Sequence, residues 1–365
     1  MDTTRTMLLQ SLANTISDYR KGEIAPITPA HVERWLNQFD FNDQHVILAE
    51  MDAIMKRLYF SRSRVKECIR TFLKDKIVRN NDPGQLFPHI SFLNIQRRGS
   101  SQSMMVDLAD EILREDYGYP LSAIGTHEVK IYIYLDDSIY TGNKIRYDLT
   151  EGRNTTGWLS TCLYPDCTLW VYTIGGHVEG IKYARRYILN AAQTKGIKFY
   201  RETTVMLDNT RCPGSSIEML WPENLHDPYV DSYVSELKAT LAQRERFADI
   251  FRGIAPVQER LFSSPETRRV VEQAFLKKGI QLVKASRNPA PSIRPLGFMK
   301  LVSLGFGTFF VTYQNIANNC PLVLWWGDPN LPPTHPLGQW YPLFPRCTNE
   351  QRDIIGYEQT FNEPF

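Results

Sequence analysis

The chain has 365 residues, of which 42% are hydrophobic, and a formal net charge of only +2, so it can bury a sizeable core. A charge so close to zero excludes an overall electrostatic field that would attract nucleic acid. The sequence contains no run of about 18 apolar residues that would predict a membrane span. Six scattered cysteines predict no disulfide framework, and the N-terminus lacks the pattern of a signal peptide. We therefore expect a globular, cytoplasmic protein without a membrane segment.

The first part of the chain, residues 1–84, is expected to be a helical region. Pro29 opens a segment with apolar residues at three- and four-residue spacing, and further helices are expected over about 43–59 and 63–75. The sequence NNDPG at 80–84 has the residues of a turn. We place the first domain boundary there.

Residues 85–210 alternate between strand-like and helical segments, which predicts a parallel sheet flanked by helices. The fold class is thus α/β. The expected strands cover 89–95, 131–135, 168–174 and 197–201. The expected helices cover about 104–115, part of 143–163, and 178–194.

Residues 211–365 give a weaker pattern, and we interpret them as an α+β extension that packs on the core as a hood or cover. Helices are expected around 230–251 and 266–278, and strands at 280–283, 308–313 and 322–326. The last 40 residues are rich in Pro and Trp, which predicts an ordered wrap because exposed aromatic surface is costly.

The most informative segment is KIYIYLDDSIYTGNKI, residues 130–145. A buried strand over 131–135 is expected to end at Asp136 and Asp137. Ligands of open parallel sheets collect at the carboxyl ends of strands, where these acids can reach sugar hydroxyls or a hydrated Mg²⁺ ion. The alternative is an exposed Asp-rich turn. Two carboxylates about 4 Å apart repel by about 4 kcal/mol at an effective dielectric of 20, which favours a bound partner over a bare turn.

The spacing resembles the PRPP-binding signature of type I phosphoribosyltransferases, in which a hydrophobic strand leads into two acids, three variable residues and Thr-Gly. The resemblance implies that Asp136 and Asp137 hold the ribose 2- and 3-hydroxyls and a Mg²⁺ ion, directly or through those hydroxyls and water. It also implies a loop around the 5-phosphate, formed by Ser138, Ile139, Tyr140, Thr141 and Gly142, with Asn143 and Lys144 behind it. Many members have a small residue and then Thr after the Gly. The chain has Asn143 and Lys144 there, so Lys144 would have to compensate for a missing hydroxyl.

A second loop, RRGSS, precedes the expected helix at 104–115, where phosphoribosyltransferases keep their pyrophosphate loop. The resemblance assigns Arg97, Arg98, Gly99, Ser100 and Ser101 to pyrophosphate binding. Alone, the pattern favours a surface turn with two solvated arginines. The downstream acid motif favours the pyrophosphate loop.

Three further residues are candidates for the pocket. His177 follows the strand at 168–174 and would contact a base or donate a proton, although a helix-capping histidine has the same pattern. Asn318 and Asn319 precede Pro321, which is first of all a turn. Arg185 and Arg186 on the helix at 178–194 are interpreted as a solvated face.

Over nearly the whole chain, the sequence resembles a phosphoribosyltransferase-like family of effectors in bacterial conflict systems. This implies an anti-phage enzyme that acts at C1 of a ribose 5-phosphate, in PRPP or a nucleotide, under the control of a defence-system protein or nucleoprotein. A homo-oligomer is also compatible. One alternative is a PRPP- or nucleotide-sensing module without catalysis. Another is a nucleic-acid-associated scaffold that docks through Lys56, Arg57, Arg62, Arg64 and Lys66, residues that also serve to keep a helix soluble.

Overall fold

The computed structural model describes residues 3–96, 100–150, 156–162, 166–240, 250–286, 290 and 292–346. The chain forms two compact units. One, the sheet unit, comprises Arg62–Thr210, and the other comprises Met1–Ser61 with Arg211–Phe365. Residues 62–84 therefore belong to the sheet unit, which ends at Thr210.

The sheet unit contains a four-stranded parallel sheet in the order β2-β3-β4-β5. Its strands are β2 (Ile90–Leu93), β3 (Ile131–Ile139), β4 (Thr168–His177) and β5 (Lys198–Leu207). Neighbours in the sheet are also neighbours along the chain, and parallel neighbours require a crossover between them. The predicted parallel α/β sheet is therefore confirmed.

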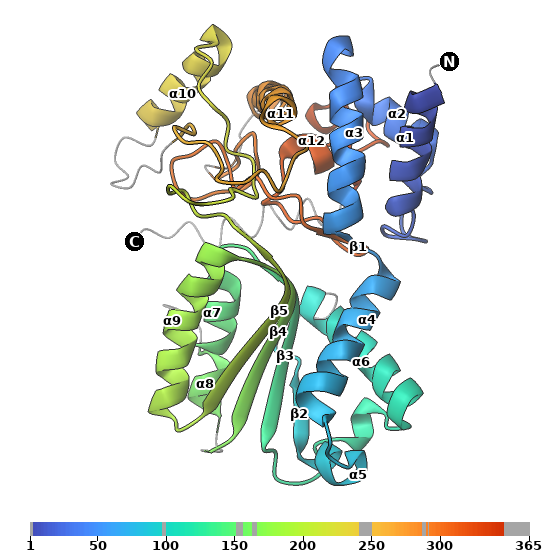
Figure 1. The fold of residues 1–365 in the computed structure, drawn as a ribbon, viewed down its shortest axis with the longest axis vertical. Coiled ribbons are helices and arrows are strands. Elements are labelled where there is room, and N and C mark those ends of the chain that lie inside the picture. Colours follow the sequence, from blue (N-terminus) through green and yellow to red (C-terminus); the bar gives the residue numbers. More distant parts are fainter. Residues whose placement is uncertain are drawn as a thin grey trace. The chain divides into compact units, whose positions relative to one another are not determined.

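Helices cover both faces of this sheet (Figure 1). The helices of the unit are α4 (Arg62–Phe72), α5 (Pro83–Leu86), α6 (Ser101–Tyr117), α7 (Asn143–Leu149), α8 (Trp158–Thr161) and α9 (Val178–Thr194), with a π-helical turn at Leu73–Val78. On the α4 face, Phe72 stacks on Tyr172 with 4.3 Å between ring centroids. On the other face, Tyr134 and Leu169 pack with residues of α7 and α9 in one apolar cluster. Coverage of both faces explains why β3 is a nearly continuous buried run.

Several predicted boundaries were wrong. The last three strands each extend beyond their predicted ends, and β3 includes both acids and continues to Ile139. The extension is paired, because Ser138 and Ile139 lie opposite Gly175 and Gly176 of β4. The predicted strands at 280–283 and 322–326 are helical, in α11 (Pro265–Ala285) and α12 (Leu322–Trp325). Short apolar runs do not distinguish a strand from the buried side of a helix.

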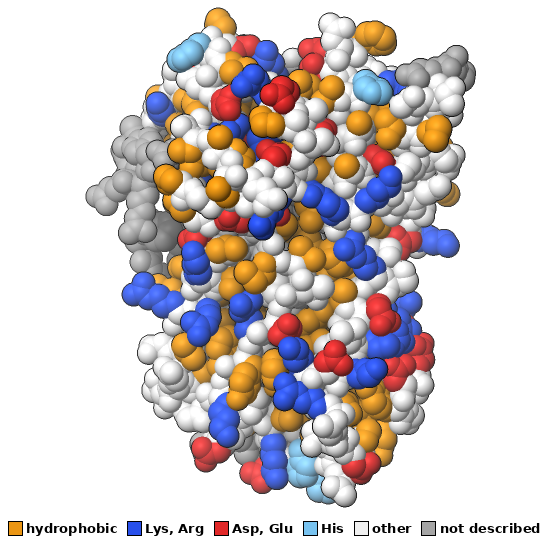
Figure 2. Space-filling view, viewed as in Figure 1, with side chains coloured by type: hydrophobic (Ala, Val, Ile, Leu, Met, Phe, Trp, Pro, Cys, Tyr) orange, Lys and Arg blue, Asp and Glu red, His pale blue; other side chains and the backbone are white. Residues whose placement is uncertain are grey.

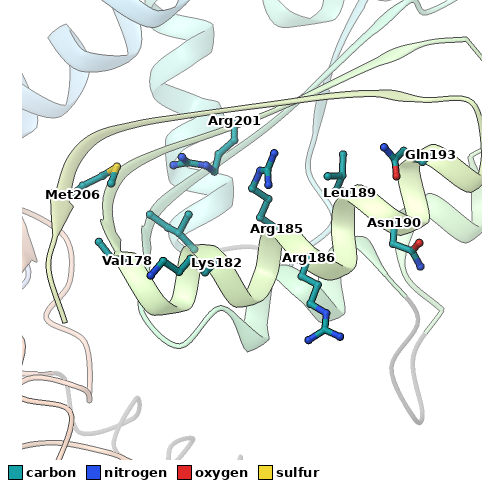
Figure 3. A pocket seen from close by; sticks show the side chains of 10 residues that line it. Val178, Lys182, Arg185, Arg186, Leu189, Asn190, Gln193, Arg201 and Met206 are labelled. Atoms are coloured by element: carbon teal, nitrogen blue, oxygen red, sulfur yellow. The ribbon is translucent and has the colours of Figure 1, made fainter. Parts of the chain in front are cut away.

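One side of the sheet unit is hollowed. Lys and Arg side chains, with hydrophobic ones between them, lie over α9 and the strands beside it (Figure 2). A cavity of about 570 Å³ lies between α9 and β5, and its lining includes Arg185 and Arg201 (Figure 3). No residue of the predicted phosphate site lines this cavity.

The regular elements of the other unit are mostly helices. Its elements are α1 (Thr3–Thr15), α2 (Pro29–Leu36), α3 (Phe41–Leu58), α10 (Pro228–Thr240), α11, α12, and the two-stranded pair of β1 (Tyr59–Phe60) and β6 (Val311–Thr312). Trp35 of α2 and Trp340 both donate their indole N–H to the Val323 carbonyl, at 2.8 and 2.9 Å. No helix in the described ranges is long and apolar enough to cross a membrane.

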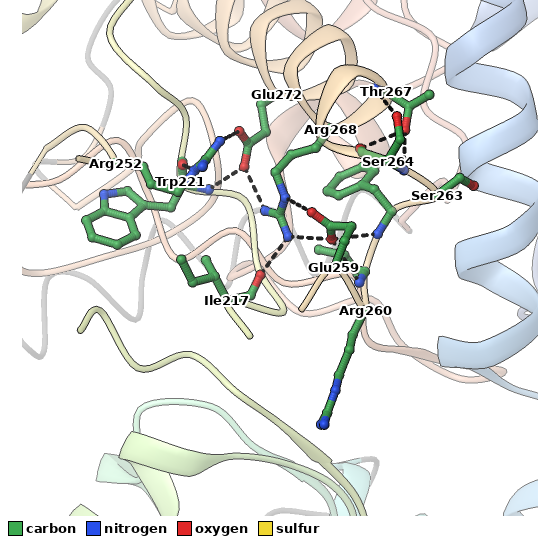
Figure 4. A network of polar contacts seen from close by, with 12 residues as sticks. Ile217, Trp221, Arg252, Glu259, Arg260, Ser263, Ser264, Thr267, Arg268 and Glu272 are labelled. Carbon is green, nitrogen blue, oxygen red and sulfur yellow. Dashed lines mark hydrogen bonds and ion pairs between the residues drawn. The ribbon is translucent and has the colours of Figure 1, made fainter. Parts of the chain in front are cut away.

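A buried ion network fixes α11 to the preceding loop (Figure 4). Arg268 is fully buried, and its guanidinium donates to Glu259 at 2.7 Å and to Glu272 at 3.0 Å. The same guanidinium donates to the carbonyl oxygens of Ile217 and Met219. With these hydrogen bonds the charge is satisfied internally, so we interpret the network as structural.

Candidate functional site

The predicted acids lie inside β3, in the half of the strand nearest its carboxyl end. Asp136 is 3% exposed and Asp137 is 6% exposed. The strand continues past them because β4 runs beside it as far as His177. The acids are therefore buried members of a parallel strand rather than a solvated turn.

Asp136 is the centre of a hydrogen-bond network. It accepts hydrogen bonds from the backbone N–H of Asp137 at 2.9 Å and from the hydroxyl of Ser101. Its other donors are Gln96 at 3.2 Å and Tyr134 at 3.1 Å, and Lys144 forms an ion pair with it at 3.4 Å. These contacts bring together one residue of the predicted pyrophosphate loop and one of the predicted phosphate loop around the first acid.

Three members of this network were missed from the sequence. The Tyr134 hydroxyl and the Gln96 amide also donate to Asp148 of α7, at 2.7 and 2.8 Å. Tyr134 lies two residues before Asp136, and residues two apart share a face of a strand, so this partner was predictable. Gln96 follows β2 and was predictable from the rule that ligands gather at the carboxyl ends of neighbouring strands. Nothing in the sequence marks Asp148.

The two neighbouring acids differ in ionisation. Burial opposes the charge of Asp136, but Lys144 and the donors Ser101, Asp137 N–H and Gln96 outweigh it and lower the pKa of Asp136. Burial and the charge of Asp136 raise the pKa of Asp137 to about 7. Asp137 accepts the Ser138 N–H at 2.6 Å, and no side chain of the described residues donates to it. The pair therefore holds one stable charge and one carboxyl that titrates near neutrality.

Lys144 supplies the cationic group of the site. Its side chain is 57% exposed, and its ammonium lies 3.2 Å from the Ser101 hydroxyl. Loss of solvent around the ammonium disfavours its charge, but the carboxylates of Asp136, Asp137 and Asp148 outweigh this effect and raise the pKa of Lys144. It stays protonated and can meet a further anion on its exposed side.

The predicted phosphate loop begins with an unpartnered hydroxyl. Ser138 is 9% exposed, and its Oγ has no hydrogen-bond partner among the described residues. Buried hydroxyls are normally paired, so this atom marks a place for a ligand or water. The Oε1 of Gln96 and the Nε2 of Gln102 are also buried and unpartnered within the described ranges. Three polar atoms thus lack partners close in sequence to the acids and their donors.

The rest of the loop is held by glycine contacts with α9. Gly142 has φ +80°, and a Cβ there would lie 2.3 Å from the Gly180 carbonyl oxygen. A Cβ on Gly180 would lie 1.8 Å from the Tyr140 carbonyl oxygen. Because neither position leaves room for a side chain, the Thr141-Gly142 turn is pressed against the first turn of α9.

The predicted pyrophosphate loop is described only at its two serines. Arg97, Arg98 and Gly99 lie outside the described residues. Ser100 is the N-cap of α6 and accepts the Ser103 N–H, while Ser101 donates to Asp136. The two serines therefore anchor the start of α6 and the network, and their pyrophosphate role remains a prediction.

The other predicted pocket residues fall in different units. His177 is fully buried at the end of β4, and its Nδ1 lies 3.1 Å from the Ile139 carbonyl oxygen. Burial lowers the pKa of His177 to about 4, so the ring is neutral at physiological pH. Asn318 and Asn319 belong to the other unit, where Asn319 donates to the Phe298 carbonyl at 3.0 Å. Their role in a pocket stays a prediction.

A metal ion shared with a substrate stays a prediction. Within the described part of the chain, no group of three or more His, Cys, Asp or Glu side chains is placed to hold a metal. Two carboxylates at the end of a strand suit Mg²⁺, which keeps several waters and takes further oxygens from phosphates. Asp137 and Asp136 would hold such an ion.

The basic residues proposed for nucleic-acid docking are largely neutralised. Lys56 pairs with Asp52 at 2.6 Å. Arg62 pairs with Glu111, which also pairs with Lys66 at 3.1 Å. Arg57 donates to two backbone carbonyls, and burial lowers the pKa of Arg64. These contacts favour a structural role for this set.

A family model, PRTase-CE, matches residues 32–346 and so covers most of the chain, including the sheet, the acids and the loop. Comparisons with curated proteins and with solved structures find no match. The name denotes phosphoribosyltransferase-like conflict effectors, and the parallel α/β sheet agrees with such a fold. The chain belongs to the PRTase-CE family.

Proposed function

We propose that this protein is an enzyme that makes or breaks a bond at C1 of a ribose 5-phosphate, with PRPP or a nucleotide as its substrate. One observation carries the proposal. Two buried carboxylates, Asp136 and Asp137, directly precede the unpartnered hydroxyl of Ser138 at the carboxyl end of a parallel strand. Family membership supports a transferase-type enzyme in general.

The two acids would have unequal roles. Asp136 already accepts several hydrogen bonds and would keep the site rigid. Asp137 accepts only a backbone N–H from the described residues and would take the hydroxyls of the ribose. Binding a hydroxyl donor favours the ionised form, so the substrate would lower the pKa of Asp137 from about 7. Ser138 and the following loop would take the 5-phosphate.

Mg²⁺ would neutralise charge on the phosphates when it is bound. The other contributions to catalysis come from residues of the chain. Cleavage at C1 passes through a transition state with oxocarbenium character, and the leaving group gains negative charge. Lys144 presents an ammonium next to the acids and would stabilise that charge, a contribution that is larger in the transition state than in the ground state. Holding the ribose in one orientation supplies the remaining rate acceleration.

Within the family context, we propose that the reaction depletes or modifies nucleotides during phage infection, with activity released by a partner. A sensing module that binds PRPP without turnover uses the same contacts. The two functions differ only in whether product forms.

Titration calorimetry of the full chain with PRPP and Mg²⁺ tests binding. Chromatography of nucleotide or PRPP incubations then detects a product. The double variant Asp136→Asn, Asp137→Asn should lose both signals, whereas Asp107→Asn, which removes an exposed carboxylate of α6 in the same unit, should lose neither. Absence of PRPP binding by the native chain, or unchanged turnover in the double variant, would sink the proposal. Binding without product assigns the sensing role.

A further inference from the structure

The cavity between α9 and β5 lies on the α7–α9 face of the sheet unit, at the edge strand (Figure 3). Its lining includes four cationic residues: Lys182, Arg185 and Arg186 of α9, and Arg201 of β5. The sequence favoured a solvated helix face for Arg185 and Arg186. Both are exposed, in agreement with that prediction, and both also line a hollow of about 570 Å³.

The positive charge in this hollow is poorly compensated. Lys182 pairs with Glu179 at 2.9 Å, but within the described ranges no carboxylate pairs with Arg185, Arg186 or Arg201. Among the residues that the structure describes, Arg201 donates only to the Thr203 hydroxyl, at 3.0 Å. In Figure 3 the side chains of Arg185 and Arg201 approach one another from the helix and the strand.

The nearby charge of Arg185 disfavours the charge of Arg201. Burial and the nearby Arg185 together lower the pKa of Arg201. Both guanidinium groups remain charged, since arginine is not deprotonated in proteins. A bound anion would relieve the repulsion and would meet planar donors that suit phosphate.

The shape of the hollow favours a linear anion. Its lining runs along α9 from Val178 to Gln193, which corresponds to about 22 Å of helix axis. Several phosphates of one strand fit that length, since they follow one another at about 3.4 Å along the axis even in a stacked duplex. Asn190 and Gln193 add polar groups, and the floor includes the apolar Ile181 and the half-exposed Met206.

We propose that this groove binds the phosphodiester backbone of a single-stranded nucleic acid, with the arginines on the phosphates and the apolar floor beside the bases. The charges of the groove and the ligand are complementary, and binding of this kind tolerates any sequence. The site is separate from the acids of β3 and does not depend on the proposed reaction.

Fluorescence anisotropy of the full chain with labelled single-stranded DNA and RNA of about 12 nucleotides tests the groove. The variant is Arg185→Ala, Arg201→Ala, and the matched control is Arg114→Ala on α6, which covers the opposite face of the sheet. Each lost phosphate contact should weaken binding about fivefold at 0.1 M salt and reduce the slope of log K against log salt by about 0.7. The double variant should therefore bind about 25-fold more weakly than the native chain, and the control should bind like the native chain.

Circular dichroism and melting temperatures show whether each variant is folded. If the double variant is not folded, Arg186→Glu, at an exposed position, gives a second test. Three results would overturn the proposal: no binding at about 50 mM salt, equal binding by the double variant and the control, or equal competition by a polyglutamate peptide and an unlabelled oligonucleotide. Competition by a free mononucleotide at the same phosphate concentration would also overturn the proposal, because such competition would indicate a site for a single phosphate.

Discussion

Replacement of Asp137 by Asn is predicted to stabilise the sheet unit above neutral pH while removing the proposed ribose contact. Burial and Asp136 raise the pKa of Asp137 from 3.8 to about 7 in the folded protein. Between these values the unfolded chain loses the proton and the folded chain keeps it, so stability falls as the pH rises through this window and stays constant above it. Asn cannot ionise and avoids this loss.

The size of the effect follows from the shift. Each pKa unit corresponds to about 1.4 kcal/mol, so ionised Asp137 lowers the free energy of unfolding by about 4 kcal/mol above pH 7. This is an upper limit, because the substituted amide must also be buried. About 3 kcal/mol of it develops between about pH 5 and about pH 8.

The assay is urea unfolding at these two pH values, monitored by hydrogen–deuterium exchange of peptides from β3. This readout measures the stability of the sheet unit separately from the other unit. The native chain should lose about 3 kcal/mol more than Asp137→Asn between the two pH values, and Asp107→Asn should behave like the native chain. A variant that is less stable than the native chain at pH 8, or a difference that does not change with pH, would refute the reasoning.

Three further substitutions test the packing around the site and in the second unit. Gly180→Ala places a Cβ 1.8 Å from a carbonyl oxygen of the phosphate loop, so it should cost about 1–3 kcal/mol and weaken PRPP binding, as measured by thermal melting and calorimetry. Tyr134→Phe removes the hydroxyl that donates to Asp148 at 2.7 Å and should cost about 1–3 kcal/mol in urea unfolding. Arg268→Met leaves Glu272 buried without its main partner and should cost about 3–5 kcal/mol, which a lower melting temperature of the second unit would report.

The order of strands and helices in the sheet unit was predictable, because each element carries its own pattern. The helix predicted at 178–194 is α9 with the same bounds. The strand ends were not predictable. Asp136, Asp137 and Ser138 have the composition of a turn, as do Gly175 and Gly176, and pairing with the neighbouring strands keeps these segments in strands. Strand length therefore depends on a neighbour that is remote in sequence.

The candidate site also has a part that was predictable from the sequence and a part that was not. The acids and the loop are contiguous, so the sequence shows them together. Two further members of the hydrogen-bond network come from elsewhere: Gln96 from the end of β2, and Asp148 from α7. Gln96 was predictable from its place after a strand, whereas nothing in the sequence marks Asp148, whose side-chain hydrogen bonds form only when the chain is folded.

The inequality of the two acids connects stability with binding. A carboxylate that is buried, adjacent to another charge and supplied with a single backbone donor lowers the stability of the fold at neutral pH, and Asp137 is in this position. A ligand that donates hydrogen bonds to Asp137 would recover that free energy, because anything that favours the ionised form of the folded state stabilises it. Affinity for such a ligand should then increase as the pH rises toward about 7. Asp136, already satisfied by its neighbours, has little left to gain, so the free energy available for binding resides in the second acid of the pair.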